Sequence, residues 1–349
     1  MGRFIASLES VRGLAALTVC LFHAADVQFM GAPVLEATSA ARVLLDGHGA
    51  VVLFFVLSGF VLRSSLESRI AAPSLAVAAG FVTARVFRLF PVIIVTVLVF
   101  AAVAPLVRGQ SAQVGDVIRN ALLLDINLVG AFWTLQVEVF GSALVLAAFL
   151  IERRFGIWAV VAMTAGLLPL SFLGSLAVIG GVVSSGLFYT FLCGYLVAAL
   201  PRKAIRSSRQ AALICCGAVI AFYAANVFGF VLTQWLLLVT TISASLIVYV
   251  LSTDRCRNLL QWGPVRFLGG LSYSFYALHG LGLDLAQSFA APIEKLDPAR
   301  WIAVVLLFSI AAGAAFLFSI PMNYFIERPG ISAGRRLVAA LSSGRTEPA

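Results

Sequence analysis

The feature that most constrains the fold of this chain is a series of ten long apolar runs separated by shorter polar segments. An α-helix needs about 17–25 apolar residues to cross roughly 30 Å of hydrocarbon, and each run is near that length. Only 11% of the residues are charged, against about 25% in a typical water-soluble domain, so we expect the chain to lie in a bilayer. The runs are 9–28, 48–64, 88–107, 131–151, 156–175, 180–200, 210–226, 230–251, 264–288 and 301–326.

The least distinct boundary lies between the fifth and sixth runs. Pro169 and three glycines, Gly174, Gly180 and Gly181, must supply the break between two spans there. Without that break the chain would have nine membrane helices.

The distribution of basic residues favours ten spans. With the N-terminus inside, 19 of the 24 Lys and Arg residues fall in cytoplasmic segments and 5 fall outside. Merging the fifth and sixth runs into one span would move the basic loop 201–209 to the outer side of the membrane. We therefore expect an all-α polytopic integral membrane protein with about ten transmembrane helices and both termini in the cytoplasm. Residues 1–330 would form the transmembrane domain, and residues 331–349 a short cytoplasmic tail.

The formal net charge of +9 follows mostly from this topology and from attraction to anionic lipid headgroups. No helix-turn-helix, zinc-finger spacing or aromatic-basic surface accompanies it, so we expect no nucleic-acid partner. The five cysteines include no C-x-x-C pair, so we expect neither a disulfide framework nor a metal site.

Charged residues within the apolar runs need a reason, because each costs at least about 2.5–3.5 kcal/mol at the centre of a membrane helix. Arg12 and His23 are eleven positions apart, which is close to three helical turns. They would share one face of the first helix, separated along its axis by roughly 16 Å. The alternative is an interfacial arginine and a histidine that a neighbouring helix satisfies.

Arg85 and Arg88 lie at the inner end of the third helix, three residues apart and therefore on one side. Guanidinium groups bind phosphate in a forked, charge-assisted geometry, so the pair is suited to a pyrophosphate. Pro91 follows closely and is compatible with an opened helix start. The alternative is a basic stop signal at the cytoplasmic surface.

Glu138 lies about two turns into the fourth helix, which begins FWTLQVEVFG. A buried carboxylate could pair with His23, orient it or take a proton from it. The alternative is a structural ion pair with an arginine.

The ninth helix carries Tyr273, Tyr276 and His279 at successive steps of three residues. His279 is a second candidate for the site, although a tyrosine stripe is also typical of helix packing. His48, at the outer start of the second helix, reads as an interfacial residue.

Six segments, in their order and spacing, resemble the integral-membrane acyltransferase-3 family, the bacterial O-acetyltransferases that modify surface polysaccharides and related acceptors. The resemblance spans residues 7–329. The segments are SLESVRGLAALTVCLFHA, FFVLSGFVL, ARVFRLFP, FWTLQVEVFG, LGGLSYSFYALHG and NYFIERP.

The resemblance extends to single residues. Arg12 and His23 match the family's Arg-x10-His pair, and Arg85 with Arg88 its Arg-x-x-Arg pair. Glu138 matches the acid of its Trp-Ser/Thr-Leu-x-Val-Glu stretch. The remaining matched segment, Glu327 to Pro329, corresponds to the terminal Glu-Arg-Pro.

Two positions depart from the family's pattern. Val52 and Val139 stand where many relatives have acids. Any role of those two carboxylates does not carry over to this chain.

The resemblance implies transfer of an acetyl or other short acyl group from its coenzyme A thioester, in the cytoplasm, to a hydroxyl of a glycan, a lipid-linked sugar or a small molecule. Acetyl-CoA would be the donor substrate, and a carbohydrate of the cell envelope or an exopolysaccharide the acceptor. The protein would lie among the lipids of a bacterial inner membrane. A separate periplasmic partner is left open.

The same resemblance suggests a division of roles in the site. Arg85 and Arg88 would bind the nucleotide phosphates, with Arg12 assisting at the mouth. His23 would carry the chemistry, as general base or as acyl carrier, and Glu138 would set its protonation state. From their place in the ninth helix, Tyr273 and His279 are further candidates for substrate binding.

Two other functions use the same buried polar groups. A transporter or flippase of a sugar or lipid-linked intermediate is the main alternative. The absence of a recognisable internal repeat and the arginines clustered on the donor side count against it. An inactive membrane subunit of an envelope assembly would not require an intramembrane histidine and glutamate.

Overall fold

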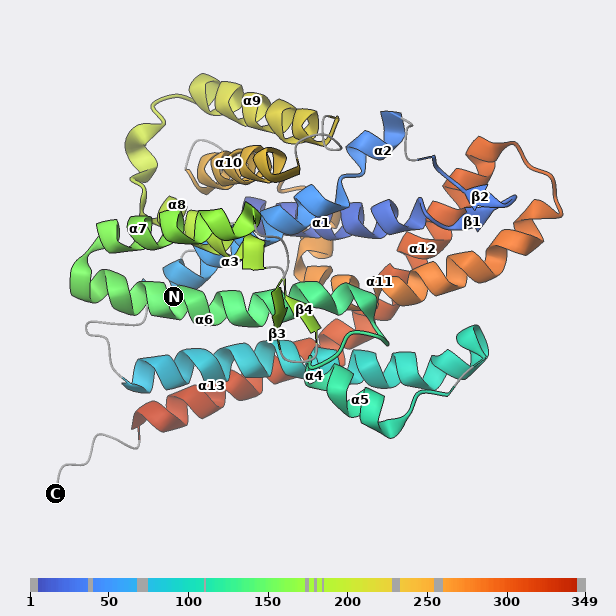
Figure 1. The fold of residues 1–349 in the computed structure, drawn as a ribbon, viewed down its shortest axis with the longest axis horizontal. Helices are drawn as coiled ribbons and strands as arrows, with labels where there is room; N and C mark the ends of the chain where they lie inside the picture. The colour runs from blue at the N-terminus through green and yellow to red at the C-terminus, as the bar shows by residue number, and fades with distance from the viewer. Residues whose placement is uncertain are drawn as a thin grey trace.

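The structure is a computed structural model that describes residues 6–36, 40–67, 75–109, 111–172, 176–178, 181–183, 185–227, 233–253 and 260–343. Within these residues the chain is almost entirely helical, as expected (Figure 1). Each of the ten apolar runs overlaps one helix. These helices are α1 (Ala6–Ala24), α3 (Gly47–Glu67), α4 (Leu75–Arg108), α6 (Trp133–Phe155), α7 (Ile157–Leu167), α8 (Phe188–Ala199), α9 (Ser208–Val227), α10 (Thr233–Ser252), α11 (Gly263–Glu294) and α12 (Arg300–Met322).

Six helical stretches in the described part of the chain are long and apolar enough to cross a membrane, so the protein is polytopic. Helices α1 and α11 fall outside this set, although they lie at the centre of the fold in Figure 1. Both carry polar residues that lower their hydropathy. Helices α7 and α8 are apolar but shorter. The count of ten spans and the cytoplasmic termini stay predictions. The six stretches are Ala41–Glu67, Ala76–Leu106, Gly130–Phe155, Ser208–Ala225, Trp235–Ser252 and Arg300–Ala340.

The uncertain region between the fifth and sixth runs forms two helices. Pro169 lies in a short helix that directly follows α7, and Gly181 is the first residue of a strand. Gly174 and Gly180 lie outside the described residues. A break between two helices is therefore present, while the crossing of the membrane by each helix stays a prediction. Its elements are η2 (Leu168–Phe172), β3 (Leu176–Val178), β4 (Gly181–Val183) and η3 (Ser185–Leu187), with β3 and β4 antiparallel.

A second antiparallel hairpin, β1 (Gln28–Phe29) with β2 (Ala32–Pro33), follows α1, and the short helix α2 (Ala40–Leu44) leads into α3. These two small hairpins are the departures from an all-helical chain within the described residues.

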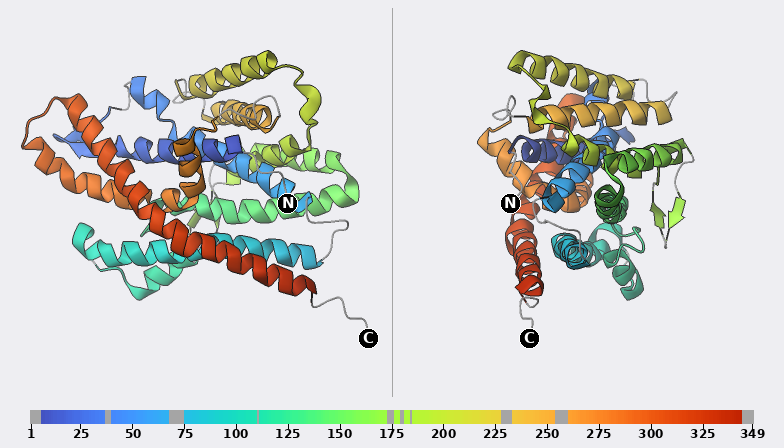
Figure 2. Two further views of the ribbon diagram at one scale, coloured as in Figure 1. Left: turned by 180° about the vertical axis from the view of Figure 1, so that it is seen from behind. Right: turned by 90° about the vertical axis from the view of Figure 1, so that its left-hand side faces the viewer.

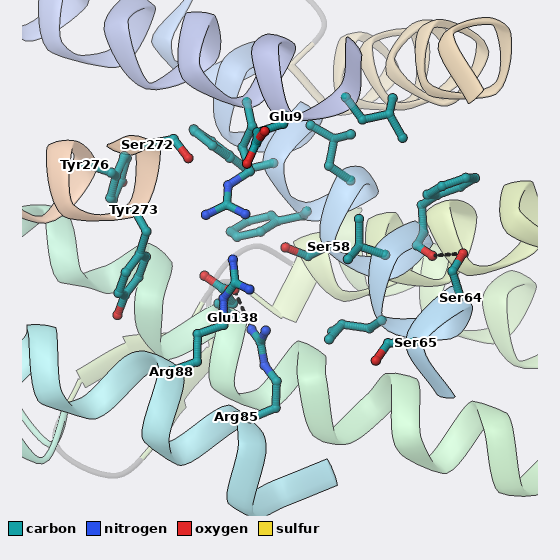
Figure 3. A pocket seen from close by; sticks show the side chains of 18 of the residues that line it. Glu9, Ser58, Ser64, Ser65, Arg85, Arg88, Glu138, Ser272, Tyr273 and Tyr276 are labelled. Carbon is teal, nitrogen blue, oxygen red and sulfur yellow. Dashed lines mark hydrogen bonds and ion pairs between the residues drawn. The ribbon is translucent and has the colours of Figure 1, made fainter. Parts of the chain in front are cut away.

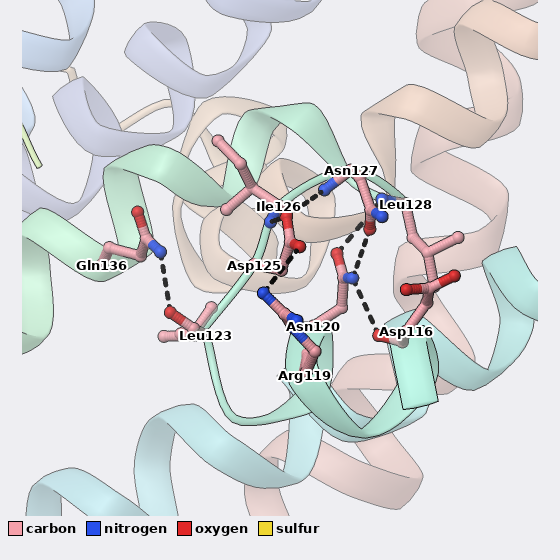
Figure 4. Close-up of polar contacts among 9 residues, drawn as sticks. All are labelled: Asp116, Arg119, Asn120, Leu123, Asp125, Ile126, Asn127, Leu128 and Gln136. Carbon is pink, nitrogen blue, oxygen red and sulfur yellow. Dashed lines mark hydrogen bonds and ion pairs between the residues drawn. The ribbon is translucent and has the colours of Figure 1, made fainter. Parts of the chain in front are cut away.

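A fully buried asparagine organises the connection between α4 and α6, which contains α5 (Val114–Ala121) and the turn η1 (Gly130–Phe132). The Asn120 amide donates to the carbonyl of Asp116 at 2.8 Å and to the Asn127 side chain at 2.6 Å (Figure 4). The Asn120 side-chain oxygen accepts from the backbone N–H of Leu128 at 3.1 Å. This network fixes the loop that sets the starting point of α6.

The C-terminal segment forms helix α13 (Arg328–Ser343), which continues α12 through a π-helical turn, η6 (Asn323–Glu327). Figure 2 shows these three elements, in red, as one long rod across the molecule. The domain boundary expected at residue 330 thus falls inside a helix, and α13 packs along α4. Residues 344–349 of the expected tail lie outside the described residues.

Glycines allow several helices to touch backbone to backbone. A Cβ on Gly59 of α3 would overlap the carbonyl oxygen of Phe191 in α8, and a Cβ on Gly194 of α8 would overlap that of Val56. Gly13 of α1 meets Gly269 of α11 in the same way. Small residues at such crossings are how membrane helices gain packing energy, since lipid offers no hydrophobic drive for their association.

We predict that Gly59→Ala lowers the free energy of unfolding by about 1–3 kcal/mol, because the methyl group forces α3 and α8 apart. Thermal unfolding of the purified protein in detergent measures this. Gly313→Ala is the matched control, since a Cβ there meets open space. Equal stability of the two variants would contradict the crossing.

Candidate active site

A cavity of about 530 Å³ opens between α1, α3, α4, α6 and α11, and its charged lining is mostly positive. Two glutamates, Glu9 and Glu138, and five arginines are the charged residues among the described residues that line it, which leaves an excess of three positive charges. The arginines are Arg12, Arg85, Arg88, Arg202 and Arg335. Such a lining attracts an anionic ligand.

Arg85 and Arg88 enter the cavity from one side of α4, as their spacing predicts (Figure 3). The Arg85 Nη2 atom lies 2.6 Å from the Glu138 Oε1 atom of α6, and the two side chains are only 14% and 20% exposed. The ion pair joins α4 to α6. The Nε–H of Arg85 is buried and has no hydrogen-bond partner among the described residues, so it is a donor available to a ligand.

Arg12 is placed by the crossing of α1 and α11, because Gly13 lies directly against Gly269. It interacts electrostatically with Arg85, Arg88 and Glu138, and also with Glu327 of the π-helical turn. Arg12 is therefore one member of a compact set of charges drawn from four elements.

Glu327 is buried and held from two sides. Its carboxylate accepts hydrogen bonds from the Ser274 hydroxyl at 2.6 Å and the Asn323 amide at 2.9 Å. Asn323 lies one turn before it in the same π-helical segment, and its amide also contacts the carbonyl of Gly270 at 3.2 Å. These hydrogen bonds hold the Glu327 carboxylate near the positively charged cavity, although Glu327 does not line it.

The two histidines of the predicted site form a stacked pair outside the cavity lining. The ring of His23 lies on that of His279, with centroids 5.6 Å apart and planes 22° from parallel. His279 is buried, and its Nδ1 atom lies 2.5 Å from the carbonyl oxygen of Tyr276. Because a carbonyl only accepts, this contact requires the proton on Nδ1 and leaves Nε2 as an acceptor.

His23 lies at the surface of the protein, at the end of α1 away from Arg12. Its neighbour Phe22 makes edge contacts with the rings of His23, at 5.3 Å, and His48, at 5.2 Å. The chain's three histidines thus lie close together around Phe22 and His279.

Tyr276 stands between the cavity and the histidine pair. It lines the cavity, and its ring centroid lies 5.3 Å from that of His279. Its hydroxyl is hydrogen-bonded to the Thr134 hydroxyl of α6 at 2.8 Å. Tyr273, one turn earlier, also lines the cavity and donates to the carbonyl of Leu89 at 2.9 Å.

The structure corrects one contact expected from the sequence. Glu138 does not pair with His23; its partner is Arg85, which was the alternative interpretation. The arginines, Glu138 and Tyr273 share one cavity, whereas His23 and His279 lie beyond Tyr276.

The match to known families agrees with this arrangement. The family model described as an acyltransferase domain, that of the acyltransferase 3 family, matches residues 5–324. The chain belongs to the acyltransferase 3 family. It is therefore a membrane acyltransferase. Comparisons with curated proteins and with solved structures gave no match.

The cavity of this acyltransferase contains charged residues to which sequence reasoning assigned no role. Glu9 lies in the first turn of α1, Arg202 in the turn η4 (Arg202–Ala204), and Arg335 in α13. In the sequence the two arginines read as part of the general excess of positive charge at the inner surface. Only the packing of α13 and of η4 shows that they line the cavity.

We predict that Glu138→Ala destabilises the protein by about 3 kcal/mol, because it leaves the buried Arg85 without its partner. The double variant Arg85→Ala with Glu138→Ala is expected to recover part of this loss, with a coupling energy of about 1–3 kcal/mol. Unfolding of the four species in detergent measures the coupling.

The matched control is the pair Arg119–Asp125, at 3.5 Å and with the arginine 54% exposed, for which we expect a coupling energy below about 1 kcal/mol. Additive effects of the two substitutions at Arg85 and Glu138 would contradict a stabilising ion pair.

Proposed function

We propose that this acyltransferase moves an acetyl or other short acyl group from acyl-CoA in the cytoplasm to a hydroxyl of a cell-envelope glycan or an exopolysaccharide, in a bacterial inner membrane. The observation that carries the proposal is a cavity lined by five arginines and separated by one tyrosine from a stacked histidine pair. The acyl-CoA donor carries negatively charged phosphates at one end and an electrophilic thioester at the other. The arginines suit the phosphates, and the histidines suit the thioester.

The arginines supply the grip on the donor. Arg85 and Arg88 present guanidinium groups from one helix face, and phosphates accept such groups in short, charge-assisted hydrogen bonds. Glu138 holds Arg85 in position through its ion pair. The unpartnered Nε–H of Arg85 and the buried hydroxyl of Ser272 add two donors for the ligand.

The histidines supply the chemistry. In direct transfer, the acceptor oxygen forms a bond to the thioester carbonyl carbon while the carbon–sulfur bond breaks. His23 takes the hydroxyl proton and returns it to the departing thiolate of coenzyme A. In transfer through an acyl-imidazole, a nitrogen of His23 attacks the carbonyl carbon, the carbon–sulfur bond breaks, and coenzyme A leaves as the thiol with the ring proton. In the second step the acceptor oxygen attacks the acyl carbon, the carbon–nitrogen bond breaks, and the hydroxyl proton returns to the imidazole.

Tyr276 and Thr134 lie on the path between donor and acceptor. The pantetheine arm of the donor must pass the tyrosine ring to bring its thioester to His23. Tyr273, in the cavity wall one turn earlier, would guide the arm, and His279 would contact the acceptor beside His23.

We predict that His23→Ala reduces acyl transfer by at least about 100-fold, the usual contribution of a general base, while donor affinity stays within twofold, because His23 is not in the cavity lining. Arg88→Ala should instead raise the KM for acyl-CoA about tenfold or more. The assay supplies radiolabelled acetyl-CoA and envelope glycans to membranes containing the protein and measures alkali-labile acetyl ester.

His48→Ala, which alters the other histidine beside Phe22, is the control and should transfer normally. Normal transfer by the His23 variant would remove its catalytic assignment. No ester with any envelope glycan would argue against this acceptor class.

A further inference from the structure

Helix α13 lies directly against the turn of α4 that carries the two cavity arginines. A Cβ on Gly334 would come within 2.7 Å of the Phe87 Cβ, and a Cβ on Gly330 within 2.7 Å of the Phe87 carbonyl oxygen. Phe87 lies between Arg85 and Arg88 in the sequence. Two glycines on one face of α13 thus bring it into contact with the phosphate-binding turn.

Arg335 follows Gly334 and lines the cavity, although it lies outside the residues matched by the family. Arg202, from the turn η4, lines the same cavity. Both side chains are exposed, whereas Arg85, Arg88 and Arg12 are partly buried. The arginines of the cavity therefore form two groups. The inner level consists of Arg12, Arg85 and Arg88, and the outer level, at the rim, consists of Arg202 and Arg335.

The two levels differ in their counter-charges. At the inner level Arg85 is paired with Glu138 and Arg12 interacts with Glu327. Within the described part of the chain, neither Arg202 nor Arg335 forms an ion pair. The rim thus presents two guanidinium groups whose charge is available to a ligand.

Coenzyme A carries its phosphates in two places. The pyrophosphate joins the pantetheine arm to the nucleoside, and a separate phosphate sits on the 3′ oxygen of the ribose, at the end far from the thioester. A donor whose thioester points to Tyr276 and whose pyrophosphate meets Arg85 and Arg88 has its 3′-phosphate at the rim.

We propose that Arg335, with Arg202, forms a second phosphate subsite that binds the 3′-phosphate of the donor. The inference rests on the proposed function, since it assumes a coenzyme A thioester as donor. Helix α13 then contributes to donor selection, so that an adenosine-containing donor with a 3′-phosphate is preferred over one that lacks it.

The test compares binding of coenzyme A and of 3′-dephospho-coenzyme A to the purified full-length protein in discs of zwitterionic lipid. Wild-type protein should bind the dephospho compound about five- to tenfold more weakly, since it loses a charge-assisted contact at an exposed site. Arg335→Ala should weaken binding of coenzyme A by a similar factor and leave binding of the dephospho compound within twofold. Arg202→Ala should behave in the same way with a smaller effect.

Arg336→Ala is the matched control, because it removes the same charge from the next position of α13 but Arg336 does not line the cavity. It should bind both compounds as the wild type does. A thermal unfolding midpoint equal to that of wild type verifies that each variant is folded.

Three results would overturn the subsite. Equal weakening of both compounds by Arg335→Ala would indicate general attraction of anions, and equal effects at Arg335 and Arg336 would indicate net charge alone. An Arg335 effect that appears only when anionic lipid is added would assign the rim to lipid headgroups. Failure of the wild-type protein to bind coenzyme A at all would overturn the proposed donor together with this subsite.

Discussion

The site depends on how closely the helices around it can approach one another. At four contacts, α1 with α11, α3 with α8, α11 with α12, and α13 with α4, a glycine stands where any side chain would overlap the facing helix. Inside a bilayer these contacts replace the hydrophobic drive that packs soluble helices, since apolar groups gain little by leaving lipid for protein. The positions of Arg12, Ser272 and Tyr273 follow from the first contact, because Gly13 directly follows Arg12 and Gly269 lies about one helical turn before Ser272 and Tyr273.

Electrostatics explains why the arginines can share one cavity. Positive charges in apolar helices are unfavourable unless anions or water accompany them. Glu138 and Glu327 supply anions from α6 and from the π-helical turn, and Glu9 adds a third in the cavity wall. The remaining positive excess is what a polyphosphate ligand would neutralise, and it lies toward the rim, away from the histidines.

The long helices could be predicted from sequence because their apolar runs are near the length of a membrane span, whereas α7 and α8 are shorter than the runs that predicted them. The spacing of Arg85 and Arg88 also predicted that they lie on one side of their helix, because residues three positions apart share a face whatever surrounds them. The partner of Glu138 could not be predicted. The sequence does not show whether this face of α6 packs toward α1, which carries His23, or toward α4, which carries Arg85.

The role of α13 was missed for a related reason. A polar, arginine-rich end has the composition of a cytoplasmic tail, and only its two glycines, read against α4, indicate a docked helix. Arg12 and His23 were predicted to share one face of the first helix, but only Arg12 lines the cavity. Three helical turns separate the two residues far enough for His23 to lie beyond the cavity, against His279.

The π-helical turn at Asn323–Glu327 bears on how this region tolerates length changes. Such a turn inserts one residue into an otherwise regular helix, and each residue of an α-helix advances the angular position by about 100°. The extra residue is taken up within the wide turn, so removing one residue here would relax the turn into an ordinary helix and leave Gly330 and Gly334 facing α4. Removing a second residue would rotate everything after it by about 100° and turn both glycines away from α4. The segment between α12 and α13 can thus lose one residue, but not two, without undocking α13.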